Sequence, residues 1–168
     1  MEQRREDFRI AWEQDQDTIG RVLRSLLVVE HFLTEHIRAK NPALGDVDAA
    51  RLTFVQKVGL IGENDYIGIQ LRPGLLRLNT VRNRLAHNLH EKVSIADRDV
   101  FLSVYFYKAL RTEGQKRFGP EPDDPLSILE DFSKFAAGIF QSSASPDTEY
   151  WRKAQQALEE EAANNDRE

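Results

Sequence analysis

The sequence predicts an all-α fold: an antiparallel bundle of four or five helices with an extra C-terminal helix or tail. Apolar residues recur at steps of three and four over several long segments, the spacing that gives a helix one buried face. No segment alternates apolar and polar residues over the length of a strand. The chain has 168 residues, of which 40% are hydrophobic, which is enough for one domain with a substantial core.

The first predicted helix is long and amphipathic. Asp17 or Thr18 can cap its start, and Asn41 with Pro42 ends it. Its apolar face consists of Ile19, Val22, Leu23, Leu26, Leu33 and Ile37.

The next two helices are separated by a short loop. Asp48 can cap a second helix that contains the segment LTFVQKVGLIG and ends at Gly62. The third helix is expected to start near Arg72 and Pro73, because proline suits the first turn of a helix.

A fourth helix is predicted to open at Ser94, since Asp97 three residues later completes a pattern resembling a capping box. Residues 111–125 are rich in Gly and Pro and are expected to form a loop whose first residues prolong this helix. The inward side chains of the helix are expected to be Phe101, Val104, Tyr105, Tyr107 and Leu110.

A fifth helix is predicted to start at Asp124 and Pro125, with a clear apolar face. That face consists of Leu129, Phe132, Phe135, Ala136 and Ile139. The predicted organisation is therefore a charged N-terminal segment, a helical bundle, a linker and an acidic C-terminal helix or tail. These parts span residues 1–17, 18–141, 142–146 and 147–168.

Composition limits the class of protein. The absence of cysteine excludes disulfides, a thiol nucleophile and cysteine-ligated zinc. A formal net charge of −5 argues against a protein that coats nucleic acid through bulk charge. No apolar run approaches the roughly 20 residues that span a bilayer, and no apolar block follows the basic N-terminal residues. We therefore expect a cytoplasmic protein with no membrane partner.

One segment carries the functional information. Residues 82–88, RNRLAHN, place the guanidinium of Arg82 and the imidazole of His87 five positions apart near the end of the third predicted helix. The spacing alone is weak evidence, because two other Arg and His pairs in the chain are spaced similarly.

The surroundings distinguish this pair from the others. Between Arg72 and Lys92 there are five basic residues and one acidic residue, Glu91. This local excess of positive charge is either a surface for RNA or a set of ordinary solvated helix residues, and both interpretations stay open. The candidate RNA-binding residues are Arg72, Arg77, Arg84, Asn88, His90 and Lys92.

The letters next to the pair go beyond spacing. Asn83 directly follows the arginine and Ala86 directly precedes the histidine, with the leucine-rich segment LRPGLLRLNTV in front and LTFVQKVGLIG further upstream. Over about residues 18–110, these features resemble the HEPN superfamily of helical bundles, and most closely its mannitol-repressor-like and related uncharacterised branches.

The resemblance implies a homodimer whose arginine and histidine line a cleft between protomers. In catalytic members it implies a metal-independent endoribonuclease, with no cofactor, that serves as a toxin or phage-defence effector. An antitoxin or a regulatory protein would then be a further partner. By the same matching, Arg82 and His87 are the catalytic pair, and Asn83 is the polar residue beside them.

The chemistry of such a pair is clear. A neutral imidazole can take the proton of a ribose 2′-hydroxyl, and an arginine can hold the charge that grows on the attacked phosphate. RNA would be cleaved and DNA spared, leaving a 2′,3′-cyclic phosphate and a 5′-hydroxyl.

The two side chains do not converge on one straight helix, because they point roughly 140° apart. The helix could break near Ala86 to Asn88, the arm of Arg82 could wrap round, or two protomers could each contribute residues about a two-fold axis. We favour the third arrangement, since symmetric dimers are the commonest oligomers.

A non-catalytic interpretation stays open. Arg82 could pair with a buried carboxylate, for which Glu30 on the first helix is the candidate, while His87 finishes the helix. The protein would then be a regulatory bundle of the mannitol-repressor-like kind. His87 and His90 are spaced to chelate a metal, but two histidines are weak evidence, and no metal site is predicted.

Overall fold

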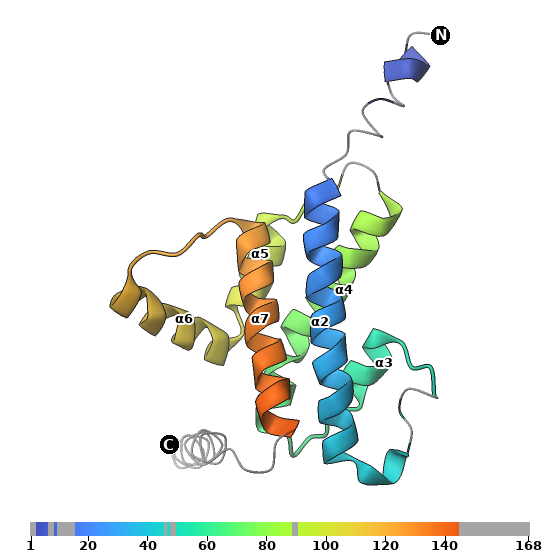
Figure 1. Ribbon diagram of the computed structural model, residues 1–168. Helices are drawn as coiled ribbons and strands as arrows, with labels where there is room; N and C mark the ends of the chain where they lie inside the picture. Colours follow the sequence, from blue (N-terminus) through green and yellow to red (C-terminus); the bar gives the residue numbers. More distant parts are fainter. Residues whose placement is uncertain are drawn as a thin grey trace.

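The computed structural model describes residues 3–6, 9, 16–45, 47, 50–88 and 91–144. Within these residues the fold is helical and contains no strand, which confirms the predicted fold class. Three long helices form the body and shorter helices surround them (Figure 1). The long helices are α2 (Gln16–Lys40), α4 (Tyr66–His87) and α7 (Pro125–Ala144), and the shorter ones are α3 (Phe54–Gly59), α5 (Ile95–Leu102), α6 (Tyr105–Phe118) and the 3-10 turn η1 (Pro42–Leu44).

Helices α2 and α7 make the most extensive contact in the fold and lie side by side (Figure 1). They run parallel, because Arg21 pairs with Glu130 near their starts and His36 contacts Ser143 near their ends. Helix α4 runs antiparallel to α2, since Asp65 at its start contacts His36. The expected antiparallel arrangement therefore holds for α2 and α4, whereas α7 starts at the same end of the bundle as α2.

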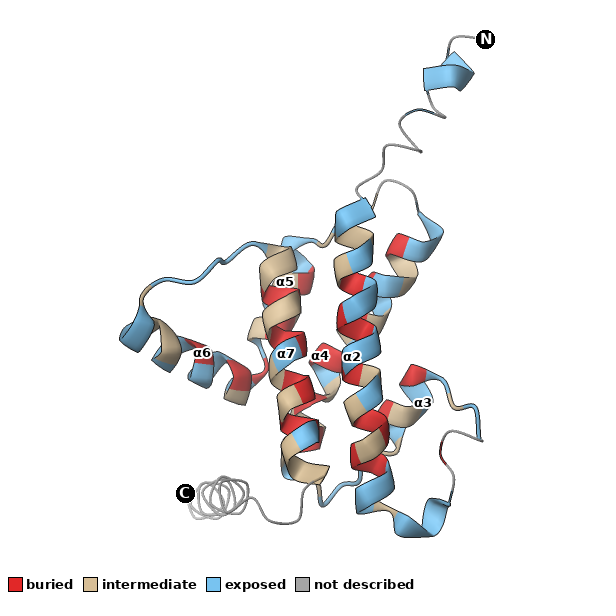
Figure 2. Ribbon diagram, viewed as in Figure 1, coloured by how far each residue is buried: buried red, intermediate tan, exposed pale blue. Residues whose placement is uncertain are grey.

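The core lies where the apolar faces of α2, α4 and α7 meet (Figure 2). Its largest fully buried side chains include Leu33, Leu75, Leu78, Phe101, Phe132 and Phe140. Helices α4 and α7 approach closely at Gly74, where a Cβ atom would lie 2.2 Å from Cζ of Phe132. Glycine is therefore required at this crossing.

Two helix starts follow capping boxes. Ser94 Oγ accepts a hydrogen bond from the backbone N–H of Asp97, whose carboxylate accepts one from Ser94 N, as the sequence predicted. Helix α3 is capped in the same way by Thr53 and Gln56. The expected cap of this helix, Asp48, lies outside the described residues.

Helix α4 starts at Tyr66, earlier than the sequence predicts. Asp65 caps the helix by accepting a hydrogen bond from Gly68 N, and Leu71 in its second turn is buried. Pro73 thus lies inside the helix instead of in its first turn. Proline costs an interior helix one hydrogen bond, and here the capped and buried first turns outweigh that loss.

The fourth predicted helix is two helices. The chain leaves helical geometry at Val104, so α5 and α6 point in different directions (Figure 1). Tyr105 and Leu110, expected in the core, are 63% and 41% exposed as a result. Most of the predicted loop 111–125 belongs to α6, which continues to Phe118 and ends at Gly119 with a φ of 93°.

Helix α6 projects from the side of the bundle, and most of its outer end is exposed (Figure 2). Its base is held by Arg111, which is buried and lies 2.8 Å from Oδ2 of Asp131 on α7. Arg111 also donates to the carbonyl of Pro122, and the hydroxyl of Tyr107 donates to Asp131. This polar cluster fixes the angle at which α6 leaves the bundle.

The predicted segment boundaries need two corrections. Helix α2 begins at Gln16, inside the expected N-terminal segment, and α7 continues through Ala144, into the expected linker 142–146. The rest of that linker and the predicted tail 147–168 lie outside the described residues. None of the helices in the described ranges combines the length and apolar character that a membrane span requires.

Candidate functional site

The RNRLAHN segment forms the last two turns of α4 and divides into two faces. Leu85 is buried with Val81 of the preceding turn, so this side of the helix belongs to the core. Arg82, Ala86 and His87 are exposed. The two residues expected to carry the chemistry thus lie at the surface of the same helix end.

Arg82 makes its hydrogen bond within the segment. Its Nη1 donates to Oδ1 of Asn83 at 2.8 Å, and in the described part of the chain it contacts no carboxylate. Asn83 lies one turn before His87, about 40° away around the helix. The bond therefore turns the guanidinium toward the face that carries His87, and Asn83 positions Arg82.

His87 is the last residue of α4. The helix does not break before it, because the N–H of Asn88 still donates to the carbonyl of Arg84. No hydrogen bond joins the His87 ring to another described residue. Both nitrogens of the ring are thus open to a ligand or to a second copy of the chain.

Arg84, predicted to bind RNA, makes three contacts within the fold. Its Nη2 lies 2.5 Å from Oδ2 of Asp97, whose side chain is 1% exposed, and it also donates to the carbonyl of Lys92. Its Nε lies 3.1 Å from Oε2 of Glu91, within ion-pair range but not aligned for a hydrogen bond. Arg84 therefore ties the end of α4 to the start of α5.

The Asp97 carboxylate is the centre of this tie. Burial by itself raises the pKa of Asp97, but hydrogen bonds from Arg84 and from the N–H and hydroxyl of Ser94 outweigh burial, so the pKa lies below its ordinary value. The hydrogen bond to Asp97 likewise raises the pKa of Arg84. Asp97 is thus a buried, ionised partner of the motif.

Two further predicted RNA contacts also serve the fold. Nη1 of Arg77 lies 3.5 Å from Oδ1 of Asp97. Nη2 of Arg72 donates to the carbonyl of Ile61, and both arginines are half-buried. The three predicted RNA-binding arginines therefore all make contacts within the fold, Arg72 near the start of α4, Arg77 at its middle and Arg84 near its end.

The remaining predicted contacts lie just beyond the helix. Asn88 and Lys92 are exposed, while His90 lies outside the described residues. The surface left for a ligand at this end consists of Arg82, Asn83, His87, Asn88 and Lys92.

The predicted partnership of Arg82 with Glu30 is wrong. Oε1 of Glu30 lies 2.7 Å from Nζ of Lys57 on α3. The antiparallel packing of α2 and α4 explains the error, because Glu30 lies near the middle of α2 whereas Arg82 lies near the end of α4, the end that is directed toward the start of α2.

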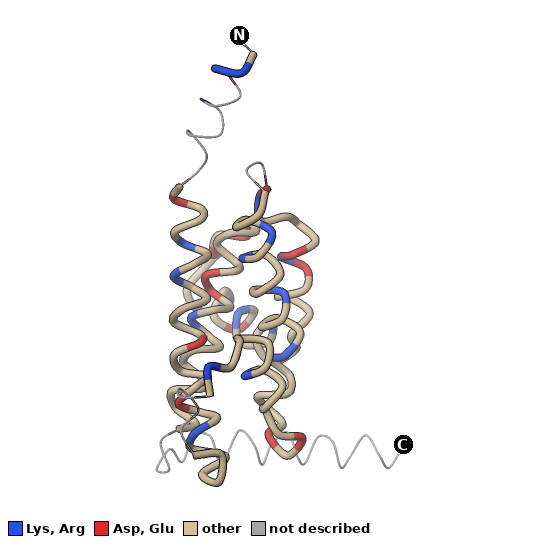
Figure 3. The backbone as a smooth tube through the Cα atoms, turned by 90° about the vertical axis from the view of Figure 1, so that its right-hand side faces the viewer, with Lys and Arg blue, Asp and Glu red and all other residues tan. Residues whose placement is uncertain are grey.

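Charge is distributed along the whole fold, with Lys and Arg interspersed with Asp and Glu (Figure 3). Arg82 differs from Arg77 and Arg84 on the same helix in lacking an acidic partner among the described residues. Within the same residues, no group of three or more His, Asp or Glu side chains could hold a metal ion. The arrangement leaves one guanidinium and one imidazole exposed at the end of α4.

Sequence reasoning missed Asp97 as a partner of the motif. The signal was available, since the capping box places Asp97 at the start of α5, but nothing in the sequence says which arginine meets it. Comparison of the chain with protein-family models, with curated proteins and with solved structures gives no match.

Proposed function

We propose that the protein is a metal-independent endoribonuclease that acts as a homodimer, with Arg82 and His87 as its catalytic pair. The observation that carries the proposal is the difference in pairing between the charged side chains of RNRLAHN. Arg84 forms a salt bridge with Asp97, whereas Arg82 and His87 are exposed and have no acidic partner among the described residues.

The chemistry follows from the two groups. His87 would take the proton of a 2′-hydroxyl, and the oxygen would attack the adjacent phosphorus and expel the 5′-oxygen of the next nucleotide. Arg82, held by Asn83, would stabilise the charge on the phosphoryl oxygens. A protonated imidazole, from the partner protomer or after the first transfer, would return a proton to the leaving oxygen.

A second protomer would supply what one helix lacks. Leu76 and His87 lie on the same side of α4, about 20° apart by helical geometry, and Leu76 is 40% exposed. On the neighbouring helix α2, Leu23 and Leu27 are 41% and 56% exposed. Exposed leucines on adjacent helices are typical of an interface, and a two-fold contact there would bring two copies of Arg82 and His87 together.

The experiment is digestion of single-stranded RNA by the purified full chain in the presence of a chelator. We expect cleavage to a 2′,3′-cyclic phosphate and a 5′-hydroxyl. An oligonucleotide of the same sequence whose sugars lack the 2′-hydroxyl should not be cleaved. Arg82→Ala and His87→Ala should each lower the rate by at least about a hundredfold. Asn83→Ala should have a smaller effect, about tenfold, because Arg82 is misplaced but present.

Matched controls exist on other helices. Arg117→Ala removes an exposed arginine of α6, and His31→Ala removes an exposed histidine of α2. Both should cleave like the wild type. Intact RNA in the wild-type reaction, or full activity in Arg82→Ala and His87→Ala, would refute the nuclease.

The alternative function is a non-catalytic bundle that regulates through protein contacts, as the resemblance to the mannitol-repressor-like branch suggests. The exposed leucines of α2 and α4 favour it, because they serve a protein partner as well as a second copy. The RNA-cleavage assay by itself distinguishes the two functions.

A further inference from the structure

Helix α6 has one face that the bundle covers only at its base. Arg111 contacts Asp131 on α7. The ring centroid of Phe106 lies 5.9 Å from that of Phe135, four residues further along α7. The side of α6 that carries Phe106 is therefore directed toward the half of α7 that leads to Ala144. Beyond Arg111 the helix projects away from the bundle (Figure 1).

This face continues outward along α6, where it is largely uncovered. The residues four, eight and eleven positions after Phe106 lie within about 80° of it around the helix. Leu110 is 41% exposed, a Cβ atom at Gly114 would meet no atom within 4 Å, and Arg117 is exposed. We call Phe106, Leu110, Gly114 and Arg117 the outer face of α6.

The tip of the outer face is positively charged. Nε of Arg117 lies 3.0 Å from Oε1 of Glu113, and Nζ of Lys116 lies 3.7 Å from Oε2 of the same residue. Two exposed cations thus share one carboxylate. A second copy of this face would bring like charges together, whereas an acidic segment would be attracted to it.

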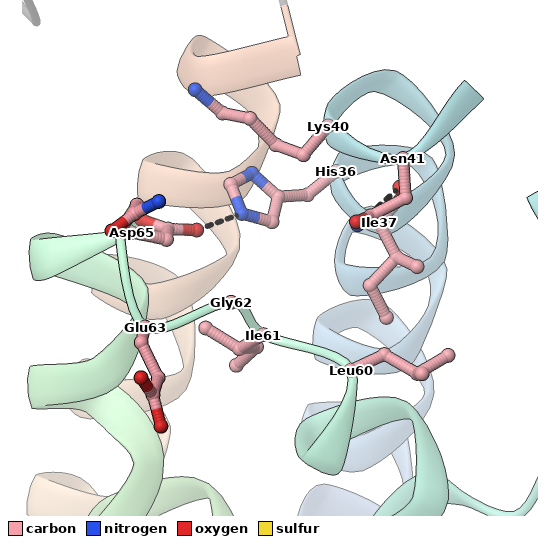
Figure 4. A pocket seen from close by; sticks show the side chains of 10 residues that line it. His36, Ile37, Lys40, Asn41, Leu60, Ile61, Gly62, Glu63 and Asp65 are labelled. Carbon is pink, nitrogen blue, oxygen red and sulfur yellow. Dashed lines mark hydrogen bonds and ion pairs between the residues drawn. The ribbon is translucent and has the colours of Figure 1, made fainter. Parts of the chain in front are cut away.

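The end of α7, from which the chain continues, is fixed by a buried contact. His36 is 2% exposed, and its Nε2 bonds to Oδ2 of Asp65 at the start of α4 (Figure 4). Its Nδ1 lies 2.5 Å from Oγ of Ser143 in the last turn of α7. The ends of three helices are therefore held together at this point.

Residues 145–168 lie outside the described residues, but the distance from α7 to the outer face is set by the fold. From Phe135 to Ala144, α7 rises about 14 Å. The six residues from 145 to 150 can span about 20 Å. Tyr150 is therefore within reach of Phe106.

The sequence after α7 has the same spacing as the outer face. Apolar residues recur at steps of four, and an acidic residue follows three positions later: Tyr150, Ala154, Leu158 and Glu161. The outer face has the same steps of four, four and three. Glu161 is the last of three consecutive glutamates, so this segment is acidic where the outer face is basic.

We propose that residues 147–168 dock as a helix along the outer face of α6 in the same chain, parallel to α6. Small residues would then lie against large ones, and opposite charges would meet at the tip. The proposal does not depend on the nuclease function. The pairs that form are Tyr150 with Phe106, Ala154 with Leu110, Leu158 with Gly114 and Glu161 with Arg117.

The chain contains no cysteine, so an introduced pair reports directly on the docking. The full chain carrying Leu110→Cys and Ala154→Cys, treated with oxidised glutathione, should form a disulfide within one molecule. Lys108→Cys with Ala154→Cys is the matched control, because Lys108 is also exposed but lies about 160° from Leu110 around α6. Since a disulfide needs Cα atoms within about 7 Å, the control should react at least about tenfold more slowly.

Non-reducing electrophoresis separates the outcomes of this experiment. A disulfide within one chain at Leu110→Cys supports the proposal. A disulfide between two chains would assign the outer face to a second copy and overturn docking within the chain. Equal rates in the two pairs, or no disulfide at Leu110→Cys, would also refute it.

Fluorescence gives a measurement without a disulfide. With Trp12→Phe, Trp151 is the remaining tryptophan. Leu110→Asp should raise the acrylamide quenching of Trp151 toward its value in the urea-unfolded chain, because a charge disfavours the apolar contact. Lys108→Asp should leave the quenching unchanged, and circular dichroism checks that both variants are folded. The same quenching in both variants would contradict the docking.

Discussion

The guanidinium of Arg84 and the carboxylate of Asp97 lie 2.5 Å apart and join the end of α4 to the start of α5. Asp97 also accepts hydrogen bonds from the backbone and hydroxyl of Ser94. The same carboxylate thus caps one helix and fixes the last turns of another. The position of His87 at the end of α4 depends on this tie.

Replacing the acid should destabilise the protein. Asp97→Asn removes the buried anion beside Arg84, leaving only the contact with the more exposed Glu91, and disrupts a helix cap, so we expect the free energy of unfolding to fall by about 2 to 3 kcal/mol. Urea denaturation measures the change. Asp99→Asn is the matched control, because Asp99 is 60% exposed and its ion pair with Arg98 should contribute less than about 1 kcal/mol. Equal losses in the two variants would contradict the role of Asp97.

The tie also predicts a pH dependence of stability. The pKa of Asp97 is lower in the folded protein than in the unfolded chain, so its stabilisation is complete above the unfolded value, near 3.8. As the pH falls below that value and through the folded pKa, the stabilisation is lost. The unfolding free energy of the wild type should therefore drop more steeply below about pH 4 than that of Asp97→Asn. Urea titrations from pH 6 to pH 2 test this, and parallel curves would count against it.

The crossing of α4 and α7 predicts opposite effects for two glycine substitutions. Gly74→Ala forces a methyl group against the ring of Phe132 and should destabilise the protein by about 1 to 3 kcal/mol. Gly20→Ala adds a methyl group on an exposed position of α2 with no atom within 4 Å, and should stabilise it by about 0.5 to 1 kcal/mol. Thermal melting shows the sign of each change. A stable Gly74→Ala protein would mean that the helices can separate at the crossing.

The homodimer that the proposed function requires can be tested separately from activity. Leu27→Glu places a charge on the most exposed of the α2 leucines and should convert a dimer to a monomer in sedimentation. Phe118→Glu, at the tip of α6, changes an even more exposed apolar residue, 87% accessible, away from the proposed interface. It should leave the dimer intact. A monomeric wild type, or a dimeric Leu27→Glu, would remove this interface.

Several helix starts could be predicted from the sequence, because they depend on local capping residues. The capping box at Ser94 and the start of α7 at Pro125 both lie where the sequence placed them. The break at Val104 and the early start of α4 were missed. Both depend on packing: Val104 is buried next to the turn, and Gly68 in the first turn of α4 fits closely against Ile61.

The candidate site could be predicted from the sequence to a similar extent. The sequence singled out Arg82, Asn83 and His87, and the structure leaves Arg82 and His87 exposed. The roles of Arg84 and Glu30 were missed, because an arginine's length lets it reach several carboxylates and only the fold decides which one is near.

By itself, the sequence determined that the protein is helical, where some of the helices begin or end, and which segment carries an arginine and a histidine together, because periodicity, caps and motif letters are local properties of the chain. Only the tertiary structure decided which charged side chains form ion pairs within the fold. Arg84 forms a salt bridge with Asp97, Glu30 forms one with Lys57, and Arg82 donates a hydrogen bond to Asn83. The physical reason is that a salt bridge depends on the register between helices, which no single segment encodes.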